Sequence, residues 1–234
     1  MFTQDPYTMK AVEYMVGLGF LALFVWFWQF VNGEAAPQPA PARAWMTQLS
    51  EWFRVPDGYA FHRGHGWARP EPSGVLTLGI DDFAQQLVGT LSAVHLPQAG
   101  AELQIGSPAW ALEADGRRVD VLAPVAGTVL AVNPDVLEHP ALVNDDPYGR
   151  GWLVKVQARR GLSALKDLMS AAAARRWMEQ VSNSLTAAMS PELGHVYQDG
   201  GMPVHGIARN IDEAHWDDVA RRFLLTDGGR NDAA

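Results

Sequence analysis

The chain has 234 residues, a formal net charge of −8 and no cysteine. This length fits one main domain with appended segments. The lack of cysteine excludes disulfides, zinc–thiolate sites, iron–sulfur ligation by this chain and a cysteine nucleophile, and the acidic balance argues against phosphate-backbone binding as the main task.

An uncharged, apolar run occupies residues 14–31. As a helix it is roughly 27 Å long, close to the hydrocarbon thickness of a bilayer, which is about 30 Å. A buried core helix is the less favoured alternative, because a helix apolar on every face is rare in a domain of ordinary size. A cleaved signal peptide is also less favoured, because the preceding segment carries acids as well as a lysine. We therefore predict that residues 1–32 hold an N-terminal segment and one transmembrane helix.

Residues 33–54 form the next predicted segment. A Pro/Ala-rich stretch over residues 33–43 is typical of an extended, semi-rigid linker. Residues 44–53 have tryptophan and leucine at spacings that favour a short amphipathic helix, packed on the following domain rather than on a membrane surface.

From Tyr59 to Gln157 the pattern changes to short alternating stretches separated by Gly, Pro and Asp. Asp81 is a good N-cap for a helix over residues 82–87, and Asp115-Gly116 is a two-residue hairpin signal. Many short strands with regular turns indicate a small all-β sandwich or barrel, and Ser163–Met189 has the apolar spacing of a helix. The predicted strands are 75–80, 91–96, 110–113, 119–122, 127–132 and 152–156.

Five motifs follow one another through this region. They are residues 62–67 (HRGHGW), 79–85 (GIDDFAQ, followed by Gly89), 96–100 (LPQAG), 120–127 (DVLAPVAG) and 142–153 (LVNDDPYGRGWL). In this order they resemble the glycine cleavage system H protein family. The resemblance implies a mainly β barrel-sandwich hybrid (lipoyl/H-protein-like) with flanking helices over residues 55–180.

One departure from the family pattern falls on the residue that matters most. The family carries lipoate on a lysine at a hairpin tip, in a Glu-Ser-Val-Lys-Ala context. Counting back from Pro124, that segment is residues 113–117 (EADGR), with Glu113 kept and Gly116 at the lysine position. Lipoylation needs a neutral amine, and the neighbouring guanidinium groups stay protonated. We predict no cofactor, with Asp115-Gly116 as an ordinary turn.

The chain has few other amines to offer. Of its 18 basic residues only three are lysines, at positions 10, 155 and 166. No lysine lies between residues 11 and 154, so a shift of register does not restore a lipoyl site.

Residues 181–234 form a predicted C-terminal extension. Asp212 suits the N-cap of a helix over residues 213–225, with Trp216 and Phe223 on its apolar face. A short amphipathic helix is marginal alone and needs a surface to cover. We expect that surface to belong to another subunit rather than to the chain's own barrel, which the family helices should already close.

The sequence contains few residues whose type and spacing favour a catalytic site or a metal site. His62 and His65 form a close pair, but the pair lies in the motif of residues 62–67 that resembles the family, where the resemblance implies no metal. His195, His205 and His215 cluster in the extension but lack acidic or cysteine co-ligands at tight spacing. Asp145-Asp146 lies in a turn motif and suits turn capping. The residues show no Ser-His-Asp arrangement, phosphate loop or dinucleotide fingerprint. We predict no metal site and no enzymatic activity.

These observations predict a non-catalytic, non-lipoylated, membrane-anchored accessory or scaffold subunit of a membrane protein complex, with a respiratory or redox (electron transport) complex as the expected setting. We expect a single-pass protein of a bacterial-type inner membrane with its soluble domain on the cytoplasmic side, and neither nucleic acid nor small-molecule substrate. The alternatives are a working lipoyl carrier and a periplasmic adaptor of the membrane-fusion type.

Four side chains are candidate contacts to partner subunits. Arg117 and Arg118, next to the former lipoyl position, suit an acidic partner surface, although solvated turn charges are the simpler interpretation. Trp216 and Phe223 lie on the apolar face predicted for the extension.

Overall fold

The chain divides into two units, residues 1–45 and residues 46–234. The computed structural model describes residues 6–32, 53–72, 74–188 and 205–226. The predicted helix over 44–53 therefore lies outside the described residues except for Phe53, and so do the segments 189–204 and 227–234.

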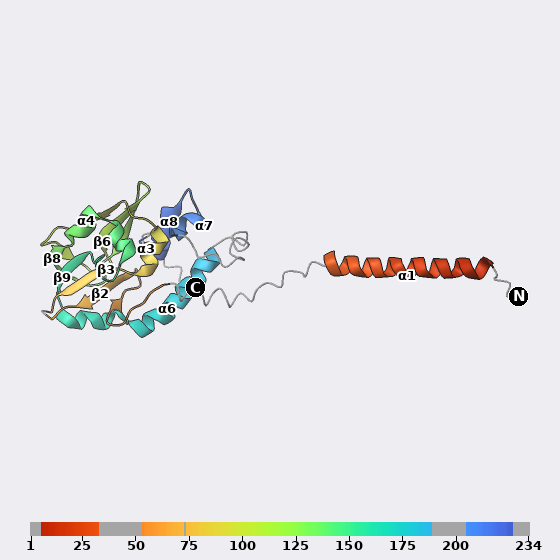
Figure 1. The fold of residues 1–234 in the computed structure, drawn as a ribbon. Coiled ribbons are helices and arrows are strands. Elements are labelled where there is room, and N and C mark those ends of the chain that lie inside the picture. The colour runs from red at the N-terminus through yellow and green to blue at the C-terminus, as the bar shows by residue number, and fades with distance from the viewer. Residues whose placement is uncertain (1–5, 33–52, 73, 189–204, 227–234) are drawn as a thin grey trace. The chain divides into compact units, whose positions relative to one another are not determined.

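The described residues of the first unit form the helix α1 (Pro6–Asn32), of 27 residues (Figure 1). Its described apolar side chains are exposed, from Tyr14 at 72% to Trp28 at 59%. The helix over residues 14–31 is thus confirmed. In the described parts of the chain, however, no helix reaches the length and apolarity that crossing a membrane requires, so the predicted span is not supported.

The second unit is built on two antiparallel sheets. The larger has seven strands in the order β10-β1-β2-β3-β9-β8-β5 and the smaller has three in the order β4-β6-β7. The strands are β1 (Ala60–Phe61), β2 (Gly66–Pro70), β3 (Leu76–Ile80), β4 (Ala93–His95), β5 (Glu102–Leu103), β6 (Pro108–Ala114), β7 (Arg117–Leu122), β8 (Gly127–Val132), β9 (Val154–Ala158) and β10 (Met169–Ser170). The predicted strands are all present; strand 127–132 has the predicted bounds, and the others differ at one or both ends.

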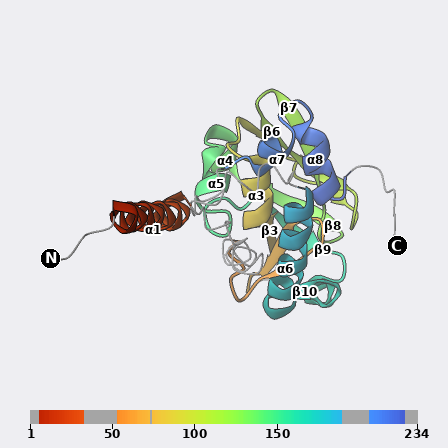
Figure 2. The same ribbon diagram turned by 90° about the vertical axis from the view of Figure 1, so that its right-hand side faces the viewer.

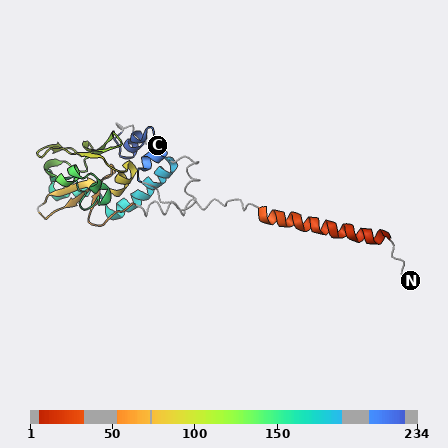
Figure 3. The ribbon, with the colours of Figure 1, turned by 45° about the horizontal axis from the view of Figure 1, so that its top comes forward.

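Helices flank the sheets, as the predicted fold class requires. Helix α3 (Asp82–Val88) lies between α6 (Ala171–Ala188) on one side and α7 (Ile207–Ile211) and α8 (Trp216–Phe223) on the other. This arrangement can be followed in Figure 2 and, by colour, in Figure 3. The helices are α3 (Asp82–Val88), α4 (Pro134–Glu138), α5 (Ala141–Asp145), the 3₁₀ helix η1 (Gly161–Asp167), α6 (Ala171–Ala188), α7 (Ile207–Ile211) and α8 (Trp216–Phe223).

Helix α3 begins where the sequence predicts, and a buried carboxylate explains why. Oδ1 of Asp81 accepts a hydrogen bond from the Ala84 backbone N–H at 2.9 Å, which satisfies one of the free donors of the first turn. Oδ2 of Asp81 lies 2.9 Å from Nδ1 of His65. The His65 ring stacks on Phe83 at 4.3 Å between centroids and lies 4.7 Å from the Trp177 ring of α6.

Two predicted helix boundaries are wrong. The helix expected from Ser163 starts at Ala171, because residues 161–167 form a 3₁₀ turn and Met169–Ser170 pairs with β1 as strand β10. The helix expected from Glu213 is α8 and starts at Trp216. Asp212 instead ends α7, and its Oδ1 accepts a hydrogen bond from the His215 N–H at 2.9 Å.

The close packing of β2 on β3 generates a stability prediction. Gly79 lies opposite Trp67, and a Cβ at Gly79 would meet the Trp67 ring at 2.5 Å. The ring is fully buried and its Nε1 donates to the Ile80 carbonyl at 2.7 Å, so it cannot yield. We expect Gly79→Ala to lower the free energy of unfolding by about 1–3 kcal/mol, measured by chemical denaturation.

The matched control is Gly66→Ala on the neighbouring strand. A Cβ there would meet Pro124 at 3.4 Å, an ordinary contact, and should change stability little. Equal losses in the two variants would contradict the steric argument.

Candidate functional site

The hairpin at the position where the family resemblance implies a lipoyl lysine is a regular two-residue turn. Ala114 of β6 pairs directly with Arg117 of β7, which leaves Asp115 and Gly116 as the loop. Their φ values of 47° and 72° are the left-handed values that a type I′ turn requires. The predicted turn is confirmed. A Cβ at Gly116 would meet nothing within 4 Å, so the outward direction from the tip is open.

The described lysines of the folded domain lie on other elements. Lys155 is in β9 of the larger sheet, and its Nζ lies 2.8 Å from Oε1 of Glu71. Lys166 is in η1. Neither belongs to the β6–β7 hairpin, so the geometry agrees with the sequence that the tip carries no amine.

The C-terminal helices pack on the chain's own domain, beside this hairpin. We call residues 205–226, which contain α7 and α8, the C-terminal cover. Ile207, Trp216 and Leu224 are at most 3% exposed and belong to the main hydrophobic core. The expectation that this segment covers another subunit is therefore wrong. The physical reason is that the apolar side chains of the cover pack in the same hydrophobic core as those of α3, where the Phe83 ring lies 5.8 Å from the Phe223 ring.

Backbone contacts place the cover tightly against α3. The Gly206 N–H donates to the Gln86 carbonyl at 2.8 Å. Gly89 ends α3 with φ +90°, and a Cβ there would meet the Gly206 Cα at 2.8 Å. Two glycines therefore allow an approach that larger residues would prevent.

Charged groups join the cover to both corners of the hairpin tip. Arg117 forms an ion pair with Asp217, and its Nη2 donates to the Ala214 carbonyl at 2.5 Å. On the other corner, Nε of Arg209 lies 2.5 Å from Oδ2 of Asp115. That second contact is an ion pair by distance only, since the Nε–H does not point along a hydrogen bond.

Arg209 contacts three parts of the domain at once. Besides Asp115, its Nη1 donates to the Val88 carbonyl at the end of α3 at 2.9 Å. Its guanidinium lies over the Trp216 ring at 4.5 Å from the centroid, a cation–π geometry. This single side chain therefore connects the tip, α3 and α8.

Asp217 is the acidic centre of the same network. It is 9% exposed, and Nη2 of Arg221 lies 2.8 Å from its Oδ2. Burial acts to raise the pKa of this carboxyl, but the hydrogen bond from Arg117 and the charges of Arg221 and Arg117 outweigh burial and hold the pKa below its usual value.

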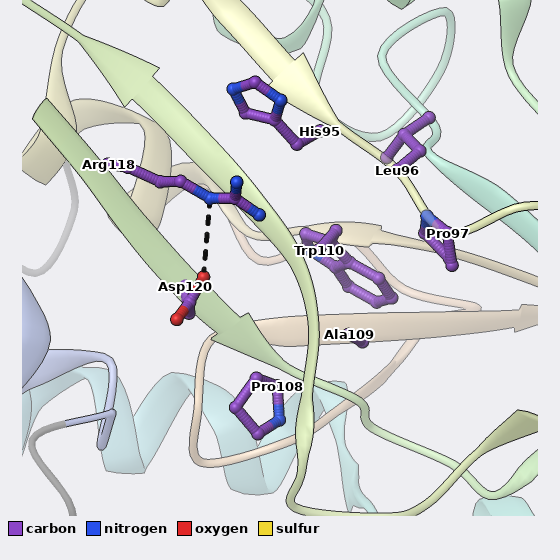
Figure 4. A pocket seen from close by; sticks show the side chains of 8 residues that line it. All are labelled: His95, Leu96, Pro97, Pro108, Ala109, Trp110, Arg118 and Asp120. Atoms are coloured by element: carbon purple, nitrogen blue, oxygen red, sulfur yellow. Dashed lines mark ion pairs between the residues drawn. The ribbon is translucent and has the colours of Figure 1, made fainter. Parts of the chain in front are cut away.

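Arg118 points to the outer face of the smaller sheet and is 58% exposed. It lines an open pocket of about 230 Å³ together with His95 and Trp110, and its Nε lies 3.8 Å from Oδ1 of Asp120 (Figure 4). Nearby, Nε2 of His95 lies 2.8 Å from Oε2 of Glu113. Sequence reasoning missed this pair, because only the strand register brings the two residues together.

The four predicted contact residues thus have different surroundings. Arg117 and Trp216 are engaged within the chain, and Phe223 is half-buried against the core. Arg118 keeps an exposed side chain, and its role as a partner contact stays a prediction.

Several of the other candidate residues have structural partners. Nδ1 of His65 is hydrogen-bonded to the carboxylate of Asp81. The pKa of His62 is lowered by burial and, to a smaller extent, by the charge of His65. Asp146 accepts hydrogen bonds from the N–H groups of Gly149 and Arg150 at 3.0 and 2.8 Å, which confirms the predicted turn capping for this residue of the pair. Within the described ranges, no group of three or more His, Asp or Glu is placed to hold a metal ion; His195 lies outside them.

The two arginines of β7 should differ in their effect on stability. We expect Arg117→Ala to lower the free energy of unfolding by about 1 kcal/mol, because it removes a charge-assisted contact from a largely buried carboxylate that keeps Arg221. Arg118→Ala should change it by less than about 0.5 kcal/mol, as for exposed pairs. Urea denaturation of both variants measures this; a larger loss in the Arg118 variant would contradict the described network.

Asp217 should give this stabilisation a pH dependence. Because its pKa is lowered by folding, the stabilisation is full above the unfolded value of about 3.9 and is lost as the pH falls through the folded value. The difference in unfolding free energy between wild type and Asp217→Asn should therefore be constant near neutral pH and shrink below about pH 4. In an Arg117→Ala background the pH dependence should be smaller. A difference that grows on acidification would refute the assignment.

Comparison with known proteins identifies the fold's relatives. The family model of the glycine cleavage H-protein matches residues 59–181. A glycine cleavage system H protein of Pseudoalteromonas atlantica is 39% identical over 104 residues, 44% of this chain and 81% of that protein. One of Hydrogenovibrio crunogenus is 38% identical over 116 residues, 50% of this chain and 89% of that protein.

A solved structure, a glycine cleavage system H protein (GCVH) from Mycobacterium marinum, is 30% identical and covers 50% of this chain and 93% of its own, with a TM-score of 0.45. Helices α1, α7 and α8 lie outside the matched residues 59–181. The chain belongs to the glycine cleavage H-protein family.

Proposed function

We propose that this chain is a non-catalytic, non-lipoylated accessory subunit that uses the H-protein fold as a scaffold within a larger protein complex. The family is one of carrier subunits that work with other subunits and do not catalyse reactions themselves. One observation carries the proposal: glycine stands at the hairpin tip, in a regular type I′ turn, where the family resemblance places the lipoyl lysine.

The C-terminal cover supports the same proposal. A carrier must present its tip to successive partners, whereas here both corners of the tip are joined to α7 and α8 by charged contacts. The hairpin thus serves as a fixed part of the domain. Moving the hairpin away from α7 and α8 would break these charged contacts, and the free energy of breaking them opposes the movement of the tip between partners that a carrier needs.

We also propose that α1 attaches the chain to a membrane of the bacterial inner type, with the domain on the cytoplasmic side. The support is the exposure of its described apolar side chains, Tyr14 to Trp28, which water solvates poorly. A respiratory or redox complex is the setting we propose. Because the chain has no cysteine, any iron–sulfur cluster in such a complex would be bound by partner subunits.

Intact mass of the full-length chain tests the absence of the carried group. The chain is co-expressed with a lipoate–protein ligase and excess lipoate, with the Pseudoalteromonas atlantica H protein as positive control. We expect the unmodified mass for this chain and a lipoyl adduct for the control, because no amine lies at the tip. A lipoyl adduct on any lysine of this chain would favour the carrier alternative.

Purification in mild detergent tests the accessory role and the attachment. We expect the tagged chain in the membrane fraction, with other subunits co-purifying in fixed ratio. A monomer without partners would contradict the accessory role, and a chain found wholly in the soluble fraction would contradict membrane attachment. A C-terminal topology reporter active only in the periplasm would favour the membrane-fusion-type adaptor.

A further inference from the structure

The C-terminal cover lies on one flank of the hairpin tip and leaves the end of the tip open. On the flank, α8 packs beside β7, and Arg209 and Asp217 hold Asp115 and Arg117. At the end, a side chain added at Gly116 would extend into open space. Small molecules can therefore reach the tip, whereas a protein that must surround the hairpin meets α7 and α8.

We infer that residues 205–226 act as an intramolecular cover that excludes other proteins from the tip of the β6–β7 hairpin. This inference goes beyond the loss of the lysine. It holds that the tip would remain closed to a protein partner even if the amine were restored.

The bonding of the cover explains why it stays closed without a partner subunit. Its apolar side chains Ile207, Trp216 and Leu224 are continuous with the domain core, and its charges complement those of the turn. Arg209 faces Asp115, and Asp217 faces Arg117. Each ion pair joins residues about a hundred positions apart, so the match arises from the fold and not from neighbouring sequence.

The same complementarity shows how to open it. Arg209→Glu together with Asp217→Arg leaves the net charge unchanged but places like charges at both corners of the tip, which repel. A matched control is Arg160→Glu with Asp167→Arg, a double reversal of an exposed ion pair in and beside η1. That control changes the same residue types away from the hairpin.

The test restores an amine at the tip and compares two reagents. The full-length Gly116→Lys chain is treated with a small acetylating reagent and, separately, with a lipoate–protein ligase and lipoate, and modification of Lys at this position is followed by peptide mass spectrometry. The ligase, supplied with lipoate and ATP, first forms lipoyl-AMP with release of pyrophosphate, and then transfers the lipoyl group to the lysine amine with release of AMP. The two reactions differ in the size of the reagent that must approach.

We expect acetylation rates within twofold in all three backgrounds: the Gly116→Lys chain, its opened version and its control version. The ligase rate should rise at least tenfold in the opened version alone. A ligase rate within twofold between the unopened and opened versions overturns the inference. An absence of ligase reaction in both also overturns it, because the tip sequence and not the cover would then exclude the ligase. A failure of the proposed function is distinct, since it appears as an adduct on the unsubstituted chain.

A second measurement covers the case in which the opened version does not fold, which circular dichroism would show. The natural chain has no cysteine, so Ser92→Cys and Glu213→Cys at two exposed positions accept spin labels specifically. Pulsed electron paramagnetic resonance should give one narrow distribution of the distance between the two labels in the otherwise unsubstituted chain. A broad distribution with a long-distance fraction of half or more would show an open cover and overturn the inference.

Discussion

The arrangement of the folded domain depends on one buried carboxylate, that of Asp81. It is fully buried, it holds the first turn of α3 through the Ala84 N–H, and it fixes the ring of His65. A buried charge is costly unless it is paired and hydrogen-bonded, so this position specifies both where α3 begins and which face it presents. Helix α6 then packs through Trp177 on His65, and the C-terminal cover packs on the far end of α3 through Gly206 and Arg209.

Much of this domain could be predicted from residue pattern. The alternation of apolar and polar residues predicted the longer strands, Asp81 predicted the start of α3, and Asp115-Gly116 predicted a type I′ turn. These three features depend on local conformational preference, which the sequence carries directly. The two-residue strands β1 and β10 carry too little pattern to be seen. Their pairing moved the start of α6 to Ala171, a tertiary effect that overrides the local helical spacing.

The position of the extension could not be predicted for a different reason. Amphipathic spacing shows that α8 has an apolar face, but not which surface that face covers. The surface that α8 covers is determined by contacts between residues distant in sequence, such as Arg209 with Asp115 and Arg117 with Asp217. In the same way, the sequence shows a glycine at position 116, where the family resemblance implies a lysine, whereas only the three-dimensional structure shows that the C-terminal cover lies on the flank of the hairpin. A shared fold leaves such changes open, because function belongs to the site and not to the scaffold.

Helix α8 also solves a problem that belongs to the smaller sheet itself. That sheet has two edges, the three-residue strand β4 and the six-residue strand β7. A strand of that length with unpaired backbone groups is a template for strands of other chains, and natural proteins shorten, charge or cover such edges. Here β4 is short, and β7 is flanked by α8. The segment that occupies the hairpin flank therefore also lies along the longer edge of the smaller sheet, where a strand of another chain could otherwise pair.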